Sequence, residues 1–328
     1  MFNNKNVLIT GGTGSFGKNL TNFLLKKFKK IKRLVIFSRD ELKQYELKKY
    51  LDPNKHSCLR FFLGDIRDKQ RLARALDGID YVFHAAALKQ VDTAEYNPFE
   101  FIKTNIVGSQ NLIDACLDSS VKKVLALSTD KASSPINLYG ATKLCADKLF
   151  ISANNIVGKK NIKFSVLRYG NVMFSRGSIL PLLLERHEQK KSFKITHTEM
   201  TRFNIELDDA INLSHFCLQK MSGGELFVPK LKSYNVVDLA KAINPKNKIE
   251  IIGIRPGEKL HEEMISKIDS LNTYQLGKIF VIIDPLNQKL IKYYKKYKKM
   301  QSHFSYNSLD NKEYLSLEEL KRIVCKYT

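Results

Sequence analysis

Residues 5–17 read Lys-Asn-Val-Leu-Ile-Thr-Gly-Gly-Thr-Gly-Ser-Phe-Gly, and this stretch decides the fold class. Its first part is a short apolar run typical of a buried strand. Its second part is rich in glycine, and an amphipathic run from Phe16 to Phe28 follows. The predicted order is strand, tight turn and helix. This is the usual first unit of a parallel α/β sheet.

The N-terminal half of the chain repeats this alternation. Further strands are expected at 33–37, 59–63, 81–84, 124–128 and 164–168, with helical stretches near 40–50, 68–77, 92–118 and 137–154. The pattern predicts an α/β fold with a doubly wound parallel (Rossmann) sheet. After Tyr169 the sequence becomes richer in Gly, Asn, Ser and Pro. We therefore expect a nucleotide-binding domain over 1–170 and a smaller C-terminal substrate-binding lobe mainly over 171–328, with some exchange of chain between them.

Composition narrows the possible functions. The chain has 328 residues, of which 43% are hydrophobic, so it can bury the core of one catalytic unit. Lys and Arg outnumber Asp and Glu by 55 to 33, which favours anionic partners. Its five cysteines form no Cys-x-x-Cys pair, and no apolar run approaches the roughly 20 residues of a membrane-spanning helix. We expect free thiols, a cytoplasmic location, no metal and no membrane insertion.

The pattern Thr-Gly-x-x-Gly-x-x-Gly over residues 10–17 predicts a dinucleotide site. Its glycines permit a tight turn, close approach of a pyrophosphate and close packing of helix on strand, with the phosphate at the helix N-terminus. Glycine turns also arise for backbone reasons alone, but the placement between strand and helix favours a cofactor. The expected contacts in this turn are Gly11, Gly14, Ser15, Phe16 and Gly17.

Ser38-Arg39-Asp40 follows the second strand, at the position that distinguishes NAD from NADP. An NAD enzyme typically places an acidic residue here against the ribose hydroxyls. Arg39, with the Ser38 hydroxyl, suits a 2′-phosphate instead. The sequence therefore favours NADP.

The ends of the third and fourth strands offer further cofactor contacts. Asp65 could accept a hydrogen bond from the adenine amino group while Ile66 packs on the ring, although a helix cap at this point is the alternative. Ala85 and Ala86 leave space for the cofactor beside the sheet. We interpret His84, just before them, as structural.

Tyr139 and Lys143 form a Tyr-x-x-x-Lys pair in a predicted helix. This spacing puts both side chains on one helix face, and a cation near the phenol would lower its pKa and make a usable base. Such a pair alone is usually a chance surface pair. Here it follows a strand that ends in Ser128-Thr129-Asp130-Lys131, which favours catalysis.

Together, the glycine turn, the Ser/Thr at the strand end and the Tyr-x-x-x-Lys pair resemble the extended short-chain dehydrogenase/reductase family. A closer resemblance, over almost the whole chain, is to the PseB-like family of inverting UDP-N-acetylglucosamine 4,6-dehydratases. The segments that carry it are 38–44, 85–89, 94–98, 127–132, 137–144 and 255–262. Lys131 is the informative detail, because the retaining sugar-nucleotide dehydratases have Thr-Asp-Glu where this chain has Thr-Asp-Lys.

The resemblance implies an NADP-dependent lyase acting on UDP-N-acetylglucosamine, at the first step of pseudaminic acid-type sugar synthesis. Tyr139 would remove the proton of the 4-hydroxyl while hydride passes from carbon 4 to NADP⁺. Lys131 would then take the proton of carbon 5, and Asp130 would help the 6-hydroxyl leave as water. Hydride would return to carbon 6, and reprotonation from the opposite face would invert carbon 5.

The implied reaction also sets requirements for Lys131 and Thr129. For Lys131 to act as a base its pKa must fall, and we expect repulsion from Lys143 and the nicotinamide cation to lower it. Thr129 would bind the sugar 4-hydroxyl or orient Tyr139, with capping of the following turn as the alternative.

The resemblance also places substrate contacts at Lys89, Asn171, Ser175, Arg176, Arg202, Arg255 and Glu258. Guanidinium groups suit a diphosphate, although each arginine could instead form a structural ion pair. Met173-Phe174 and Asn204 depart from the family pattern and leave the pocket shape and the N-acyl preference open. By analogy we expect a homo-oligomer.

Two other functions stay open at this point. An epimerase of UDP-N-acetylhexosamine on the same fold would return the hydride to carbon 4. A basic NADP-binding module could instead bind RNA or a membrane through the Lys/Tyr run at 289–299. We favour a solvated helix face for that run and no nucleic-acid partner.

Overall fold

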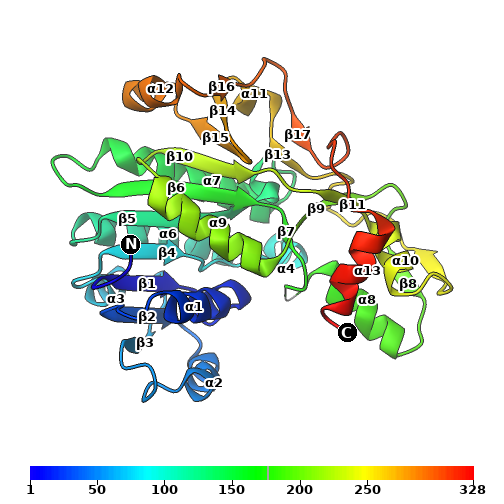
Figure 1. Ribbon diagram of the computed structural model, residues 1–328, viewed down its shortest axis with the longest axis horizontal. Helices are drawn as coiled ribbons and strands as arrows, with labels where there is room; N and C mark the ends of the chain where they lie inside the picture. Colours follow the sequence, from blue (N-terminus) through cyan, green and yellow to red (C-terminus); the bar gives the residue numbers. More distant parts are fainter. Residues whose placement is uncertain (176) are drawn as a thin grey trace.

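The computed structural model describes residues 1–175 and 177–328. The strands of its main sheet are β1 (Asn6–Thr10), β2 (Arg33–Ser38), β3 (Leu59–Leu63), β4 (Tyr81–His84), β5 (Lys123–Thr129), β6 (Lys163–Tyr169), β10 (Glu225–Pro229), β14 (Thr273–Leu276), β15 (Ile279–Ile283) and β16 (Lys298–Lys299). In the described part of the chain, these ten strands lie in the order β16-β14-β15-β10-β6-β5-β4-β1-β2-β3. Figure 1 shows this sheet at the centre of the molecule.

Strands β1 to β6 and β10 are parallel to their neighbours in this group, whereas β14, β15 and β16 pair antiparallel. Each of the six strands predicted from the sequence is present, with ends within one residue of the prediction. The predicted α/β fold with a parallel sheet is confirmed. Because β1 lies between β2 and β4, the strand order reverses there, and ligands of such sheets bind at that point.

Helices cover both faces of the main sheet. They are α1 (Ser15–Lys27), α2 (Glu41–Leu51), α3 (Lys69–Ala75), α4 (Val91–Tyr96), α5 (Pro98–Phe101), the π-helix η1 (Ile102–Val107), α6 (Gly108–Leu117), the 3₁₀ turns η2 (Asp130–Ala132) and η3 (Ala153–Asn155), α7 (Leu138–Ser152), α9 (Leu207–Lys220) and α12 (Gln288–Tyr294). Helices α1 and α9 lie against one face, and α3, α6 and α7 against the other (Figure 1). Leu8 and Ile9 of β1 point to opposite faces and join separate apolar clusters. No helix in the described residues is long and apolar enough to cross a membrane.

The remaining elements form mainly the lobe at the lower right of Figure 1. They are β7 (Asn171–Val172), α8 (Ile179–Glu188), β8 (Phe193–Ile195), β9 (Thr201–Ile205), β11 (Ser233–Asn235), α10 (Val236–Ile243), β12 (Ile249–Ile251), β13 (Glu263–Ile265), α11 (Lys267–Ser270), β17 (Tyr306–Asn307) and α13 (Leu317–Cys325). A third apolar cluster, with Leu183, Phe193, Leu239 and Leu320, packs α8, α10 and α13 around β8. The division of the chain at residue 170 stays a prediction. By strand membership, 225–229 and 273–283 belong with the main sheet.

The basic run at 289–299 forms α12 and β16 at the edge of the main sheet. Leu290 and Tyr294 are buried against the sheet, and the Lys296 ammonium lies 4.4 Å from the centre of the Tyr293 ring. The apolar side of the run anchors this edge, and its lysines face solvent. The arrangement agrees with a solvated helix face.

Candidate active site

A cavity of about 820 Å³ opens at the carboxyl ends of the parallel strands, between the main sheet and the lobe. The sheet side contributes the glycine turn after β1 and residues that follow β4 and β5, and the lobe side contributes Arg202 and residues 255–259. This is the place where doubly wound sheets bind their ligands. We take it as the candidate active site.

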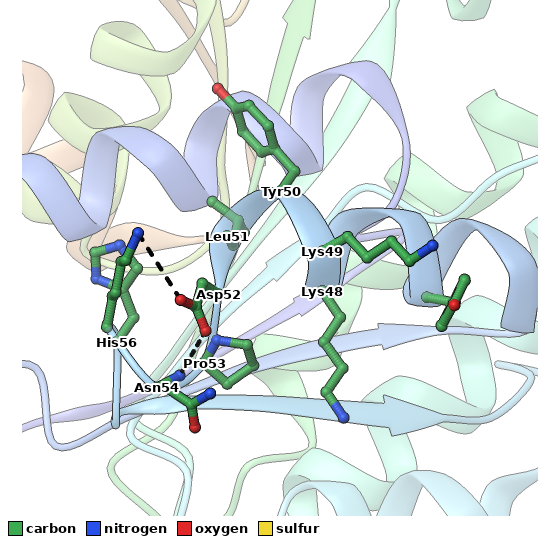
Figure 2. A pocket seen from close by; sticks show the side chains of 10 residues that line it. Lys48, Lys49, Tyr50, Leu51, Asp52, Pro53, Asn54 and His56 are labelled. Atoms are coloured by element: carbon green, nitrogen blue, oxygen red, sulfur yellow. Dashed lines mark hydrogen bonds and ion pairs between the residues drawn. The ribbon is translucent and has the colours of Figure 1, made fainter.

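A second hollow, of about 480 Å³, lies at the end of α2 and is lined by residues 45 and 48–56. Figure 2 shows its side chains, among them Lys48, Lys49 and Tyr50, around the end of α2. Asp52 accepts a hydrogen bond from the Asn54 backbone N–H at 3.1 Å. The hollow contains none of the predicted site residues. It therefore does not compete with the larger cavity.

The glycine turn has the shape that a pyrophosphate needs. Gly11 has φ +64°, and a Cβ there would lie 2.8 Å from the backbone of Ala85 and Ala86. A Cβ on Gly17 would lie 2.5 Å from the Cα of Gly12. Gly14 caps α1, and no side chain of the described residues occupies the cap. The first N–H groups of α1 are thus available to an anion, and the residues present fit a dinucleotide.

The predicted contacts to the adenosine end lie outside the cavity lining, although they are close to one another. Ser38 is buried, and its hydroxyl accepts a hydrogen bond from Nε2 of Gln44 at 3.1 Å. Arg39 is half exposed, with Nη1 3.7 Å from Oδ2 of Asp65. Asp65 also accepts a 2.7 Å bond from Nη2 of Arg67. These charges form a small cluster at the ends of β2 and β3.

The structure settles the local roles of the neighbouring residues. Helix α3 is capped by Asp68 and not by Asp65. Ile66 is buried and packs against Gly108, where a Cβ would lie 2.8 Å from its Cδ1. The Ile66 side chain therefore lies in the core and not in the cavity. Ala85 lines the cavity, whereas Ala86 does not.

His84 is a buried structural residue, as we interpreted it. Its Nδ1 lies 2.8 Å from the Thr10 hydroxyl and its Nε2 lies 3.4 Å from the Ser109 hydroxyl. Burial, with a smaller contribution from the Lys143 charge, lowers the pKa of His84 to about 3. The imidazole is therefore neutral at physiological pH and fixes β1 to β4 and α6.

Tyr139 and Lys143 both line the cavity from the first turns of α7. The Lys143 ammonium donates to the Leu127 carbonyl at 2.8 Å. Burial raises the pKa of Tyr139 to about 12, and the charge of Lys131 and a hydrogen bond with Thr129 oppose that rise. The expectation that Lys143 lowers the pKa of Tyr139 is therefore wrong, because the cation that acts on this phenol is Lys131.

Thr129 both caps a turn and contacts the predicted base. Its hydroxyl accepts from the Lys131 backbone N–H at 3.4 Å, which caps η2, and donates to Oδ1 of Asp130 at 2.9 Å. It also opposes the rise in the pKa of Tyr139 that burial causes. The capping of η2 is thus present, and the role of Thr129 toward the sugar 4-hydroxyl or Tyr139 stays a prediction. Asp130 is fully buried and lies behind the cavity wall, whereas Thr129 and Lys131 line it.

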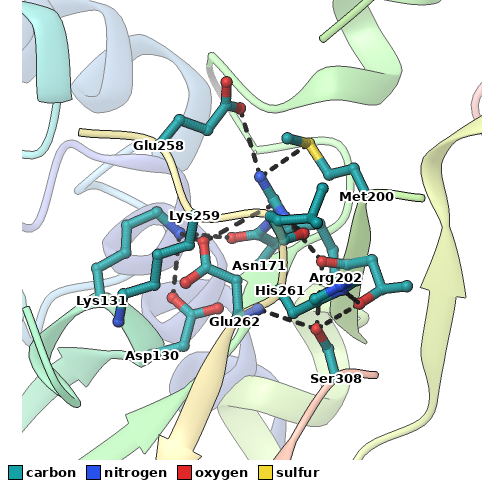
Figure 3. A network of polar contacts seen from close by, with 12 residues as sticks. Asp130, Lys131, Asn171, Met200, Arg202, Glu258, Lys259, His261, Glu262 and Ser308 are labelled. Carbon is teal, nitrogen blue, oxygen red and sulfur yellow. Dashed lines mark hydrogen bonds and ion pairs between the residues drawn. The ribbon is translucent and has the colours of Figure 1, made fainter. Parts of the chain in front are cut away.

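Lys131 lies between two carboxylates. Its Nζ is 3.1 Å from Oδ1 of Asp130, 2.8 Å from Oε1 of Glu262 and 3.3 Å from Oδ1 of Asn171 (Figure 3). Burial lowers the pKa of Lys131, but the two carboxylates outweigh it and the net shift is upward. The expected lowering by Lys143 is therefore wrong. Asp130 and Glu262 cause this upward shift. Glu262 was not assigned a role from the sequence, because no local spacing links it to Lys131.

The predicted substrate contacts converge on the cavity. Its lining includes Lys89, Asn171, Ser175, Arg202, Arg255 and Glu258, and Arg176 lies outside the described residues. Arg202 is buried, and its Nη2 lies 3.3 Å from Oε1 of Glu258. Arg255 is half exposed and contacts the same oxygen at 3.2 Å. Both arginines are thus held by one carboxylate, and Arg255 leaves part of its guanidinium facing the cavity.

The residues that depart from the family pattern lie beside this wall. Met173 is buried in the lobe, whereas Phe174 has φ +58° and stacks on the Tyr327 ring with centroids 4.3 Å apart. Asn204 is buried, and its Oδ1 has no hydrogen-bond partner in the described structure. The loop after β7 is therefore held by Tyr327, which follows α13, close to the cavity.

Comparison with known proteins agrees with this geometry. Residues 7–284 match the family described as "Polysaccharide biosynthesis protein". The chain belongs to this family. A relative from Campylobacter jejuni subsp. jejuni (strain 81-176), UDP-N-acetylglucosamine 4,6-dehydratase (inverting), is 50% identical over 332 residues, which cover 99% of this chain and 98% of the relative.

Two further relatives show the range of this similarity. A UDP-glucose 4-epimerase from Rickettsia bellii (strain RML369-C) is 41% identical, with 99% of this chain and 96% of the relative covered. The X-ray structure of Pen from Bacillus thuringiensis is 37% identical and superposes with a TM-score of 0.91, covering 100% of this chain and 99% of Pen. The resemblance found in the sequence is confirmed over the whole chain.

Proposed function

We propose that the protein is an inverting UDP-N-acetylglucosamine 4,6-dehydratase, a lyase that converts this substrate to UDP-2-acetamido-2,6-dideoxy-beta-L-arabino-hex-4-ulose. The observation that carries the proposal is the 50% identity, over 99% of the chain, to an enzyme of that name. The presence of Tyr139 and Lys131 on one cavity wall supports it. A homo-oligomer and a cytoplasmic location stay predictions.

The proposed cofactor is NADP, held by residues that already fit a dinucleotide. The turn at 11–17 would take the pyrophosphate, and Ser38 with Arg39 would take the 2′-phosphate. Tyr139 and Lys143 would contact the nicotinamide end. When bound, the nicotinamide accepts a hydride from carbon 4 of the sugar and delivers it to carbon 6.

The residues of the chain supply the proton chemistry. Tyr139, as its phenolate, accepts the proton of the sugar 4-hydroxyl. Burial raises the pKa of Tyr139 to about 12, and the charge of Lys131 and the Thr129 hydroxyl oppose that rise. Lys131 takes the proton of carbon 5. Burial, together with the charge of Glu262, raises the pKa of Asp130, and this shift favours Asp130 as the acid that gives a proton to the departing 6-hydroxyl. Because Asp130 is buried, that transfer requires its side chain to turn toward the cavity.

The proposed substrate contacts come from the lobe. Arg255 and Arg202 would bind the diphosphate, and Glu258 would orient both guanidinium groups, since it contacts each of them. Asn171 and Ser175 of the lobe, together with Lys89 from the segment after β4, would contact the sugar. Arg176 stays a prediction on sequence grounds.

An epimerase of UDP-N-acetylhexosamine is the second candidate. The 41% identity to a UDP-glucose 4-epimerase favours it. Such an enzyme would use Tyr139 in the same way and return the hydride to carbon 4, so that Lys131 would have no proton to remove. The two candidates therefore differ in whether water is lost.

The test is to incubate the purified protein with UDP-N-acetylglucosamine, without added cofactor, and to identify the product by mass spectrometry and NMR. We expect a 4-keto, 6-deoxy sugar nucleotide lighter than the substrate by one water. Tyr139→Phe should reduce turnover by about 10²–10⁴-fold, because the acid–base group is lost. A product of unchanged mass, epimerised at carbon 4, would show the second candidate to be right.

A further inference from the structure

Glu262 and Asp130 both contact the Lys131 ammonium, and their carboxylates lie close to each other (Figure 3). The Glu262 side chain is 2% exposed, and its Oε1 lies 2.8 Å from Nζ of Lys131. Its backbone is fixed as well, because the Glu262 N–H donates to the Ser308 hydroxyl at 2.9 Å and its carbonyl accepts from the Ser308 N–H at 2.8 Å. The contact between Glu262 and Lys131 is therefore built into the fold.

The second carboxylate oxygen of Glu262 has different surroundings. Oε2 is buried and has no hydrogen-bond partner among the described residues. A buried carboxylate oxygen without a donor is costly when the group is ionised, and this cost falls when the group carries a proton. Burial raises the pKa of Glu262, but the charges of Lys131 and Arg202 outweigh it and the net shift is downward. Glu262 is therefore ionised beside Lys131 in the open site, and a proton can reach it only when substrate closes the site over this contact.

The charged and titratable groups that face Glu262 and Lys131 are Asp130, Arg202, Lys259, Tyr139 and Tyr234. Arg202 Nε lies 3.8 Å from Oε1 of Glu262 and favours its ionised form. Lys259 is turned away from Glu262 and donates to the Ser133 carbonyl at 2.6 Å. Asp130 is the other carboxyl in contact with Lys131, but the proposed reaction needs its proton for the departing hydroxyl.

An ammonium cannot accept the proton of carbon 5, so Lys131 must first lose one. We propose that Glu262 accepts this proton along the existing Nζ to Oε1 hydrogen bond, and that Glu262 is thus the positioning residue that turns Lys131 into an amine base. The inference rests on the proposed function. Substrate that covers the site excludes water and lowers the local dielectric constant. A neutral amine on Lys131 beside a neutral acid on Glu262 is then favoured, relative to two buried charges, more than it is in water.

The protons balance over one turnover. The proton moves from Lys131 to Glu262, and the lone pair freed on Nζ forms an N–H bond as the C–H bond at carbon 5 breaks. Carbon 5 later takes a proton from solvent on its opposite face. The acid form of Glu262 then releases its proton to solvent, which compensates for that uptake. The proton that Asp130 gives to the departing hydroxyl is matched by the one that Tyr139 takes from the 4-hydroxyl.

Glu262→Gln tests the proposal, because glutamine still accepts a hydrogen bond from Lys131 but cannot take its proton. The measurement is the exchange of hydrogen at carbon 5 with heavy water, followed by NMR with UDP-N-acetylglucosamine across pH 6–9. We expect a pH-independent rate in the wild type. In Glu262→Gln we expect at least about a tenfold loss at neutral pH and a rise of about tenfold per pH unit, since Lys131 must then lose its proton to water. Reduction of the nicotinamide, read by its absorbance, should persist because it precedes this step.

Two further variants complete the experiment. Glu263→Gln is the matched control, because the Glu263 carboxylate contacts Ser134 at 2.6 Å and Ser305 at 3.1 Å and does not contact Lys131. We expect it to behave as the wild type. Glu262→Asp keeps a carboxyl one methylene shorter, and we expect a slower rate that is again independent of pH. This variant also decides the question if Glu262→Gln does not fold.

Exchange in Glu262→Gln that equals or exceeds the wild-type rate at neutral pH, with an unchanged pH profile, would overturn the inference. Loss of nicotinamide reduction and of exchange in equal measure would do the same, because Glu262 would then support only the structure of the site. Failure of the proposed function has a separate signature, namely that carbon 5 does not exchange in the wild type.

Discussion

Arg39 is the residue on which the proposed choice of NADP depends. It lies at the carboxyl end of β2, is half exposed, and its Nη1 is 3.7 Å from Oδ2 of Asp65. An exposed ion pair contributes only about 0–1 kcal/mol, so the guanidinium can turn to a phosphate at little cost. Arg67 binds the same carboxylate more closely, at 2.7 Å. The two arginines therefore form a matched pair for mutation.

We predict that Arg39→Ala weakens binding of NADP by about 10–100-fold, because a charge-assisted hydrogen bond contributes about 1.5–3 kcal/mol and each 1.4 kcal/mol is a factor of ten. Binding of NAD should change by less than about threefold, since NAD has no 2′-phosphate. Titration calorimetry with both nucleotides measures this ratio. Arg67→Ala should leave the ratio unaltered, and an equal loss for both nucleotides in Arg39→Ala would count against NADP as the cofactor.

At the scale of elements, the contact between α7 and η2 holds the two proposed bases in register. Gly140 lies next to Tyr139 in the first turn of α7, and a Cβ there would collide with the Lys131 carbonyl oxygen. Asn137 caps α7 by accepting from the Gly140 N–H at 2.7 Å. The distance between the Tyr139 and Lys131 backbones is thus set by a glycine that has an ordinary helical conformation.

Gly140→Ala should therefore reduce both stability and turnover. Alanine in a helix is favoured over glycine by about 1 kcal/mol, but overpacking costs about 1–3 kcal/mol, and the atom in the way here is backbone. We expect a net loss in unfolding free energy of up to about 2 kcal/mol, read by urea denaturation. Turnover should fall by about tenfold or more, because the bases move apart. Lys148→Ala, on the exposed side of α7, is the control and should keep wild-type turnover. Equal turnover in both variants would show that Gly140 does not set the spacing of Tyr139 and Lys131.

The same elements show what could be predicted from the sequence. Strands β1 to β6 are local apolar runs between turn residues, so their positions could be predicted to within one residue. The partner of Lys131 could not, because Glu262 immediately precedes β13, and its position depends on the pairing of β13 with β17. For this reason the residue types at the site were predicted, while the direction of the Lys131 pKa shift was not.

At the scale of the whole molecule, the cavity exists only where the sheet and the lobe meet. Its walls include Gly14 and Tyr139 from the sheet side and Arg202 from the lobe side. Strands β10, β14 and β15 join the main sheet from the second half of the chain. No local pattern indicated this, because the pairing of short strands depends on residues that are distant in the sequence. The arrangement places the phosphate turn, the proposed bases and the arginines around one space.

Inversion of carbon 5 during loss of water can be followed in the wild-type protein itself. The protein is incubated with UDP-N-acetylglucosamine in heavy water, and the sugar is followed by NMR. We expect a 4-keto, 6-deoxy product that carries deuterium at carbon 5, with that centre inverted. A sugar that keeps its hydrogen at carbon 5 and all its oxygen, and is altered only at carbon 4, would contradict this expectation.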